Sequence, residues 1–429
     1  MLDMKRLKEE RKKIKKILYT PDEVKAIIAG IKPIIQGISD EDVYKFTMQQ
    51  GAYLGQSFNG SKNFCDLDVE YDFNDRKGTV YPEGFADAVT RQVRLMGNMR
   101  LQDWERKGFE SMSWFKRSYL DFLSSYRYDP SEVTVRQDRK GRLFIKVNGP
   151  WYRTILWEVP ILAIVSELYF HMTGQTPNVE TFETNLVNKT FNFNRPGFTY
   201  IDFGTRRRVS YLTQEAVCLY MAQTIPDNFL GTSNCYIAFK NGLKAFGTHA
   251  HEWFMAHQAM FGTRMANEMG LESWVRMYDG ALGIALTDTF TTANFLEAFG
   301  KRYAELFTGV RHDSGCPFEF GEAIIKHYER LGIDPKSKAI VFSDGLDDKL
   351  AVELHEKFYG RIGVSFGIGT FLSNDVGFKP LSIVIKISKC RWLGTERWIY
   401  VVKLSDNPAK HHGPPEAITN TQYDIGLAA

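Results

Sequence analysis

The second half of the chain repeats one pattern of hydrophobic and polar positions. Short apolar runs end in glycine or a small polar residue, and a longer helix-like segment follows each of them. Fully buried parallel strands joined by crossover helices have this pattern. Seven runs in series favour a closed or nearly closed β/α barrel over an open sheet. The runs occupy residues 200–208, 229–234, 244–251, 282–289, 309–315, 339–345 and 362–370.

The chain before residue 154 combines two kinds of pattern. Residues 66–73 alternate between apolar and polar side chains as a strand does, and residues 83–100 have helical spacing. Residues 131–150 predict two strands joined by a turn near Arg139, Lys140 and Gly141. Antiparallel strands mixed with helices indicate an α+β domain.

The longest apolar stretch, residues 154–174, predicts a buried core helix. Glu158, Pro160 and Glu167 interrupt it, so it does not reach the roughly 18 uninterrupted apolar residues of a membrane span. Near the N-terminus, Thr20 to Glu23 have the residue types of a helix start.

Composition limits the class of protein. The 429 residues are 44% hydrophobic and carry a net charge of +3, which does not indicate nucleic acid or membrane as an obligate partner. The five cysteines lack CxxC spacing, which argues against a disulfide framework or a structural zinc site. The charged N-terminus does not resemble a signal peptide, so we expect a cytoplasmic protein. The eight basic residues among the first 19 predict a solvated helix or a docking arm for an acidic partner.

Chemically active residues follow the predicted strands, where a β/α barrel places its active site. Cations, hydroxyls and glycine amides at one mouth suit a phosphorylated ligand. The residues are Asp202, Arg206, Arg207, Arg208, Thr232, Ser233, Thr248, His249, His251, Asp288, Arg311, His312, Asp313, Ser343, Asp344, Gly367, Gly369 and Thr370.

The segment GTHAHEW, residues 247–253, has three interpretations. His249 and His251 could bind a metal ion, as in barrel hydrolases, with help from Asp288 and Asp313. One histidine could instead accept a phosphoryl group, or both could be structural. A further histidine ligand is lacking, because His312 alternates with its neighbours and should face away from them.

Ten motifs follow one another between residues 38 and 410. They are DEDVYKFTMQQ (40–50), LWEVPILAIVSELYF (156–170), DFGTRRR (202–208), GTSN (231–234), GTHAHEWFMAHQ (247–258), GIALTDTF (283–290), VRHDSG (310–315), GIDPKSKAIVFSDGLD (332–347), VSFGIGT (364–370) and KLSD (403–406). Together they resemble nicotinate phosphoribosyltransferases, which are type II phosphoribosyltransferases.

The resemblance implies an irregular β/α barrel of about seven parallel strands packed against an N-terminal α+β sandwich. We therefore expect a basic helical extension at 1–37, the sandwich at 38–153 and the barrel at 154–380, with residues 381–429 joining the sandwich.

The implied reaction joins nicotinate to 5-phosphoribosyl 1-diphosphate, and ATP hydrolysis is coupled to it through a phosphohistidine. Mg²⁺ is expected on the substrate diphosphate without a direct protein ligand. The expected partners are these small molecules and a second copy of the chain in a homodimer. Nicotinamide or quinolinate is the alternative base, and a metal-dependent hydrolase using His249 and His251 is the alternative class.

The resemblance also implies roles for individual residues. His251 corresponds to the phosphohistidine, and Asp288 and Asp313 to acidic catalytic positions. The implied nicotinate contacts are Tyr44, Phe203, Arg206, Thr248 and Arg311, and the implied phosphoribosyl diphosphate contacts are Gly367, Gly369, Thr370, Ser343 and Asp344. Cys316 stands where many relatives have aspartate, and a thiol cannot replace a carboxylate as a Mg²⁺ ligand.

Overall fold

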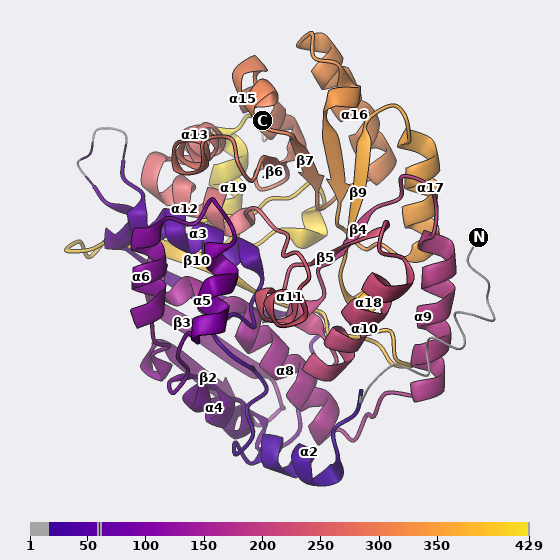
Figure 1. Ribbon diagram of the computed structural model, residues 1–429. Helices are drawn as coiled ribbons and strands as arrows, with labels where there is room; N and C mark the ends of the chain where they lie inside the picture. Colours follow the sequence, from indigo (N-terminus) through magenta and orange to yellow (C-terminus); the bar gives the residue numbers. More distant parts are fainter. Residues whose placement is uncertain (1–16, 58–59, 61, 428–429) are drawn as a thin grey trace.

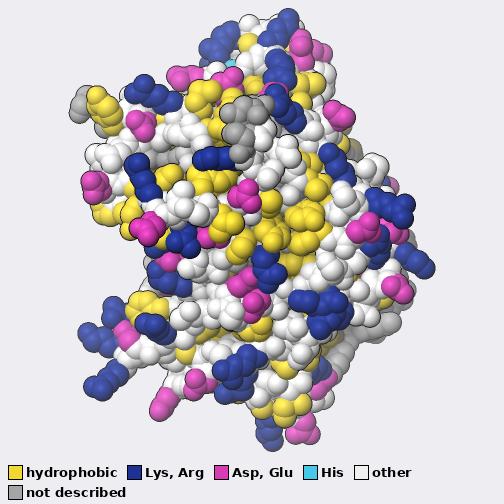
Figure 2. Space-filling view, turned by 90° about the vertical axis from the view of Figure 1, so that its left-hand side faces the viewer, with side chains coloured by type: hydrophobic (Ala, Val, Ile, Leu, Met, Phe, Trp, Pro, Cys, Tyr) yellow, Lys and Arg dark blue, Asp and Glu magenta, His cyan; other side chains and the backbone are white. Residues whose placement is uncertain are grey.

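Two sheets organise the structure, a computed structural model that describes residues 17–57, 60 and 62–427 (Figure 1). One sheet has six strands and the other has five. Most of the basic segment predicted at residues 1–19 lies outside the described residues. On the face shown in Figure 2, basic and acidic side chains are interspersed, in keeping with the small net charge.

The six-stranded sheet is parallel throughout and has the order β5-β4-β9-β8-β7-β6. Its strands are β4 (Tyr200–Asp202), β5 (Phe229–Thr232), β6 (Ile284–Leu286), β7 (Gly309–His312), β8 (Ala339–Phe342) and β9 (Gly363–Ile368). Helices follow the strands along the chain, as a β/α architecture requires. They are α10 (Tyr211–Thr224), α11 (Cys235–Asn241), α12 (His251–Phe261), α13 (Ala266–Tyr278), α14 (Thr292–Ala298), α15 (Lys301–Leu306), α16 (Pro317–Arg330), α17 (Asp348–Phe358) and α18 (Thr370–Ser373).

One of the seven strand predictions, that for residues 244–251, is wrong. Ala245 forms only an isolated parallel bridge with Thr232, and the Thr248 hydroxyl donates to the Ile284 carbonyl at 2.7 Å. The Thr248 carbonyl accepts from the Thr47 hydroxyl at 2.6 Å, so a side chain of another helix takes the place of a ladder partner. The segment therefore spans the gap between β5 and β6, which agrees with the predicted irregular barrel.

The five-stranded sheet is antiparallel, with the order β11-β10-β1-β3-β2. Its strands are β1 (Leu67–Asp75), β2 (Val133–Gln137), β3 (Leu143–Pro150), β10 (Ile383–Trp392) and β11 (Ile399–Tyr400). β10 pairs with β1 from Leu67 opposite Trp392 to Asp75 opposite Ile383. The predicted strand and hairpin of the first part are thus present, and the C-terminal segment returns to the same sheet. The domain boundaries at 37, 153 and 380 stay predictions.

The predicted core helix is α8 (Glu158–Met172). The helical stretch Trp151–Met172 is long and apolar enough to cross a membrane, but 83% of its apolar window is buried inside the protein. At the N-terminus, Thr20 and Glu23 form a capping box at the start of α2. The remaining helices are α2 (Pro21–Ile28), α3 (Val43–Leu54), α4 (Phe85–Met96), α5 (Asp103–Glu110), α6 (Arg117–Ser125), α7 (Trp151–Thr154), α9 (Val179–Phe193) and α19 (Pro415–Asp424).

Candidate active site

A polar cavity of about 150 Å³ lies where the C-terminal ends of the parallel strands meet the antiparallel sheet. Seven of the described side chains that line it are cationic, and three are carboxylates, so the cavity suits a ligand with several negative charges. Its lining comprises Asp42, Tyr44, Arg76, Phe203, Arg206, Arg207, Ser233, Ala250, His251, Arg311, Asp313, Ser343, Asp344, Gly345, Gly369, Ile383, Val384, Lys386, Lys403 and Lys410.

His251 is the first residue of α12 and has one ring nitrogen fixed. Its Nε2 lies 2.9 Å from Asp288 Oδ1. A carboxylate can only accept, so Nε2 carries the proton and Nδ1 keeps a lone pair. Nδ1 makes no hydrogen bond to the described part of the chain. Burial first, and then the charge of Lys403, lower the pKa of His251 to about 4, so the ring is neutral at pH 7.

Asp288 is buried behind the histidine. Its Oδ2 accepts from Ser314 Oγ at 2.6 Å and Ser405 Oγ at 2.9 Å. Burial acts to raise the pKa of Asp288, but Lys403 Nζ, at 3.5 Å, holds it well below its ordinary value. The carboxylate is therefore ionised and orients the imidazole.

The two histidines of the H-x-H segment do not converge. His249 is fully buried, and its ring packs edge-on against Trp274 and Phe254. Neither of its ring nitrogens has a hydrogen-bond partner in the part of the chain that the structure describes. Ligand atoms of His251, Asp288 and Asp313 do lie within 4.8 Å of one another. The ammonium of Lys403 already faces both carboxylates, at 3.5 and 3.8 Å. This geometry does not support the hydrolase alternative, which needed both histidines on one metal.

The three adjacent arginines have different environments. Arg208 is fully buried and bonds both oxygens of Asp40, at 2.7 and 2.8 Å, so it is structural. Arg206 and Arg207 line the polar cavity. Burial first, and then the charge of Arg206, lower the pKa of Arg207 to about 10.

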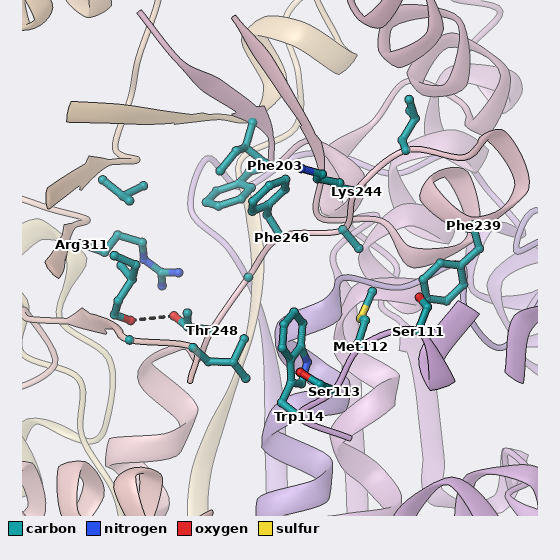
Figure 3. A pocket seen from close by; sticks show the side chains of 18 residues that line it. Ser111, Met112, Ser113, Trp114, Phe203, Phe239, Lys244, Phe246, Thr248 and Arg311 are labelled. Carbon is teal, nitrogen blue, oxygen red and sulfur yellow. Dashed lines mark hydrogen bonds between the residues drawn. The ribbon is translucent and has the colours of Figure 1, made fainter. Parts of the chain in front are cut away.

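A second cavity, of about 490 Å³, adjoins the first and is mainly apolar (Figure 3). Phe203 and Arg311 line both cavities, and Thr248 lines only the apolar one. In Figure 3 the guanidinium of Arg311 extends into this cavity from β7, between Phe203 and Thr248. The buried Nε of Arg311 has no hydrogen-bond partner among the described residues, and burial lowers the pKa of the guanidinium. An unpaired guanidinium beside aromatic rings is suited to a flat molecule with an anionic group.

Two aromatic side chains line the polar cavity, and one of them, Phe203, also lines the apolar cavity. Tyr44 on α3 lines the polar cavity, and no described residue forms a hydrogen bond with its buried hydroxyl. The ring of Phe203 packs directly on β9, because a Cβ added to Gly367 would lie 2.4 Å from it. Gly367 therefore makes room for Phe203 and does not line the polar cavity itself.

Most of the predicted site residues lie together. Tyr44, Phe203, Arg206, His251, Arg311, Asp313, Ser343, Asp344 and Gly369 line the polar cavity. Asp288 supports His251, and Thr248 lines the neighbouring cavity. Gly367 lies two residues before Gly369 and Thr370 directly follows it, but neither lines one of the two cavities. Cys316 is exposed and lies outside both cavities. His312 faces away, as predicted, and packs on Phe320 and Phe342.

Four cations of the polar cavity were absent from the predicted site. Arg76 follows β1, Lys386 lies in β10, and Lys403 and Lys410 come from the segment after β11. These residues follow no parallel strand, so a search at the strand ends does not find them. Lys403 carried one signal, since it begins the motif KLSD.

Comparison with known proteins decides the family. The family model "Nicotinate phosphoribosyltransferase (NAPRTase) family" matches residues 198–426, and the model of its N-terminal domain matches residues 40–166. The chain belongs to the nicotinate phosphoribosyltransferase family. It is thus an enzyme that transfers a phosphoribosyl group to nicotinate, and the predicted activity and its place in NAD biosynthesis are confirmed.

Individual relatives match over nearly their whole length. The nicotinate phosphoribosyltransferase of Chromohalobacter salexigens is 43% identical over 397 residues, covering 92% of this chain and 99% of the relative. That of Escherichia coli K12 is 41% identical over 388 residues, covering 88% and 92%. The crystal structure of the Porphyromonas gingivalis enzyme has a TM-score of 0.87 at 41% identity, covering 92% of this chain and all of that one. The Vibrio cholerae structure has a TM-score of 0.83 at 36% identity, covering 92% and 95%.

Proposed function

We propose that this enzyme couples the condensation of nicotinate with 5-phosphoribosyl 1-diphosphate to ATP hydrolysis, through a phosphoryl group on His251. One observation carries the proposal. The free Nδ1 of a neutral imidazole belongs to the wall of a cation-rich cavity, and that cavity meets an aromatic slot at Phe203 and Arg311.

Nicotinate would bind at the junction of the two cavities. Tyr44 and Phe203 offer aromatic faces for the pyridine ring. Arg311 offers an unpaired guanidinium to the carboxylate, with Thr248 beside it and Arg206 on the polar side. This arrangement favours nicotinate over nicotinamide, because an amide lacks the charge that would pair with Arg311.

The ribose diphosphate would occupy the polar cavity. The pyridine nitrogen bonds to the anomeric carbon as the bond to the diphosphate oxygen breaks, and the electron pair leaves with pyrophosphate. Positive charge develops on the sugar, as in glycoside hydrolysis. Asp313 lines the cavity, and its carboxylate would stabilise this charge. Arg76, Arg207, Lys386 and Lys410 would stabilise the departing charge. Ser343, Asp344 and Gly369 line the cavity and are the proposed phosphate contacts.

Mg²⁺ would be held mainly by the diphosphate oxygens. Asp313 has Lys403 at 3.8 Å, and Asp344 is paired with Lys410, so the charges of these two carboxylates are already compensated. Mg²⁺ bound to the diphosphate would add positive charge where the leaving group departs.

The coupling step is a phosphoryl transfer to nitrogen. Nδ1 of His251 forms a bond to the γ-phosphorus of ATP, the bond to the bridging oxygen breaks, and ADP takes the electron pair. Asp288 keeps the Nε2 proton in place and stabilises the positive charge that develops on the ring. Hydrolysis of the phosphohistidine would restore the free enzyme.

The direct test is an assay with purified protein, nicotinate and 5-phosphoribosyl 1-diphosphate, with and without ATP. We expect nicotinate mononucleotide in both reactions, with more product and ADP release when ATP is present. Product formation that ATP leaves unchanged would contradict the coupling and leave the transferase activity intact.

The charge of Lys386 should set the pH dependence. Burial first, and then Lys403, lower the pKa of Lys386 to about 7, with Arg206 acting in the same direction and Glu158 and Asp313 against it. Anionic substrate prefers the protonated lysine, so kcat/KM for phosphoribosyl diphosphate should be level below pH 7 and fall above it, by up to about tenfold per pH unit. In Lys386→Met the value should be lower and should not fall above pH 7. A fall that persists unchanged would assign the titration to another group.

A further inference from the structure

A cluster of paired charges adjoins the polar cavity. It consists of Lys45, Glu158, Arg206 and Glu252, which we call the Lys45 cluster. Lys45 Nζ lies 2.5 Å from Glu158 Oε2 and also bonds Glu252 Oε2. Glu158 Oε1 lies 3.5 Å from Arg206 Nη1. The two cations and two carboxylates balance. Three of them are buried, and Arg206, whose side chain is 37% exposed, faces the cavity.

The far end of the cluster is closed by neutral donors. Glu252 Oε1 accepts from Tyr71 Oη at 2.5 Å and from Trp151 Nε1 at 2.9 Å. The Lys45 side chain has no solvent exposure, and those of Glu158 and Glu252 have 8% and 6%. A buried carboxylate with these partners has one favoured position, because any shift leaves a charge or a donor unpaired.

Three of the four cluster residues either belong to the proposed site or directly follow a residue of it. Lys45 follows Tyr44 on α3, and Glu252 follows His251 in the first turn of α12. Arg206 lines the cavity itself. Tyr71 belongs to β1 and Trp151 to α7, so the cluster joins the antiparallel sheet to the barrel helix that bears the phosphate-accepting histidine.

We infer that Lys45 is a positioning residue, which fixes the spacing between Tyr44, Arg206 and His251 through its two carboxylate partners. Lys45 is buried and touches no cavity, so it acts only through other residues. Buried ion pairs often contribute little net stability compared with apolar side chains of the same volume, so stability alone does not account for the cluster. The inference rests on the proposed roles of Arg206 and His251.

Loss of the ammonium should disturb both ends of the cluster. In Lys45→Met, Glu158 has Arg206 as its remaining cation in the cluster and should draw it away from the cavity. Glu252 loses its cation, which should shift the first turn of α12 and with it His251. Displacements of this kind reduce rates on the order of tenfold to a hundredfold.

The experiment compares three variants by thermal unfolding, by KM for nicotinate and by the rate of His251 phosphorylation from ATP. Lys45→Met tests whether Lys45 positions Tyr44, Arg206 and His251. The double variant Lys45→Met/Glu252→Gln tests the same role in a cluster whose charges balance again. Glu132→Gln is the matched control, because the half-buried Glu132 bonds Arg153 and Trp157, at 2.9 and 2.8 Å, outside both cavities. It should lose stability and keep wild-type kinetics.

We expect both Lys45 variants to raise KM for nicotinate and slow phosphorylation by roughly tenfold or more, measured below their unfolding temperatures. The double variant should regain thermal stability without regaining these two values. Wild-type kinetics in either Lys45 variant would overturn the inference, as would equal defects in Glu132→Gln. A wild-type enzyme that forms no nicotinate mononucleotide would instead refute the proposed function.

Discussion

His251→Asn should abolish the proposed phosphorylation of the enzyme by ATP. Nδ1 is the ring nitrogen without a hydrogen bond, and asparagine offers no comparable nucleophile. Incorporation of labelled γ-phosphate into acid-labile form should fall to background, and ATP should no longer stimulate product formation. Phosphoribosyl transfer itself should remain measurable, because the residues proposed to bind both transferase substrates are unchanged.

Two further histidines provide the controls. His249 packs on aromatic rings, and His257 Nδ1 is 2.7 Å from the Trp253 carbonyl. Neither histidine is among the described residues that line the two cavities. His249→Asn and His257→Asn should keep the label as long as they remain folded. Label that persists in His251→Asn would place the phosphoryl group on another residue.

Arg311→Met should change the choice of base. Removing one partner of a buried charge pair costs about 2–5 kcal/mol. In the variant, kcat/KM for nicotinate should therefore decrease by a factor of between about 30 and several thousand. Nicotinamide has no carboxylate and should lose far less. The measurement is kcat/KM for nicotinate divided by kcat/KM for nicotinamide. This ratio should be much smaller in the variant than in the wild-type enzyme.

The matched control is Arg207→Met, because Arg207 lines only the polar cavity. It should raise KM for phosphoribosyl diphosphate and leave the ratio between the bases unchanged. If Arg311→Met lowered kcat/KM equally for nicotinate and nicotinamide, Arg311 would have no role in reading the carboxylate.

Local patterns were enough to predict most of the barrel. Six of the seven apolar runs are strands, because a short apolar run between turn residues defines a buried strand by itself. Residues 244–251 share the length of such a run but contain Lys244 and two histidines. Their backbone is satisfied by Thr232 and the Thr47 hydroxyl, which no local pattern reveals.

The missing part of the site depends on contacts between distant segments. Lys386 reaches the cavity because β10 pairs with β1, a contact between the two ends of the chain. Lys403 reaches it through its position beside Asp288 and Asp313. The Lys45 cluster likewise joins four segments that have no common period or motif. The sequence therefore predicted groups at the strand ends and missed the groups that the second sheet supplies.

The pairing of β1 with β10 has a consequence for synthesis on the ribosome. Residues 67–75 leave the exit tunnel long before their neighbour, residues 383–392, has been translated. At about 5–20 residues per second, that edge of β1 waits unpaired for tens of seconds, as a template for wrong pairing. Residues 383–410 also supply Lys386, Lys403 and Lys410 to the proposed site, so a nascent chain lacks these three cations until its second sheet is complete.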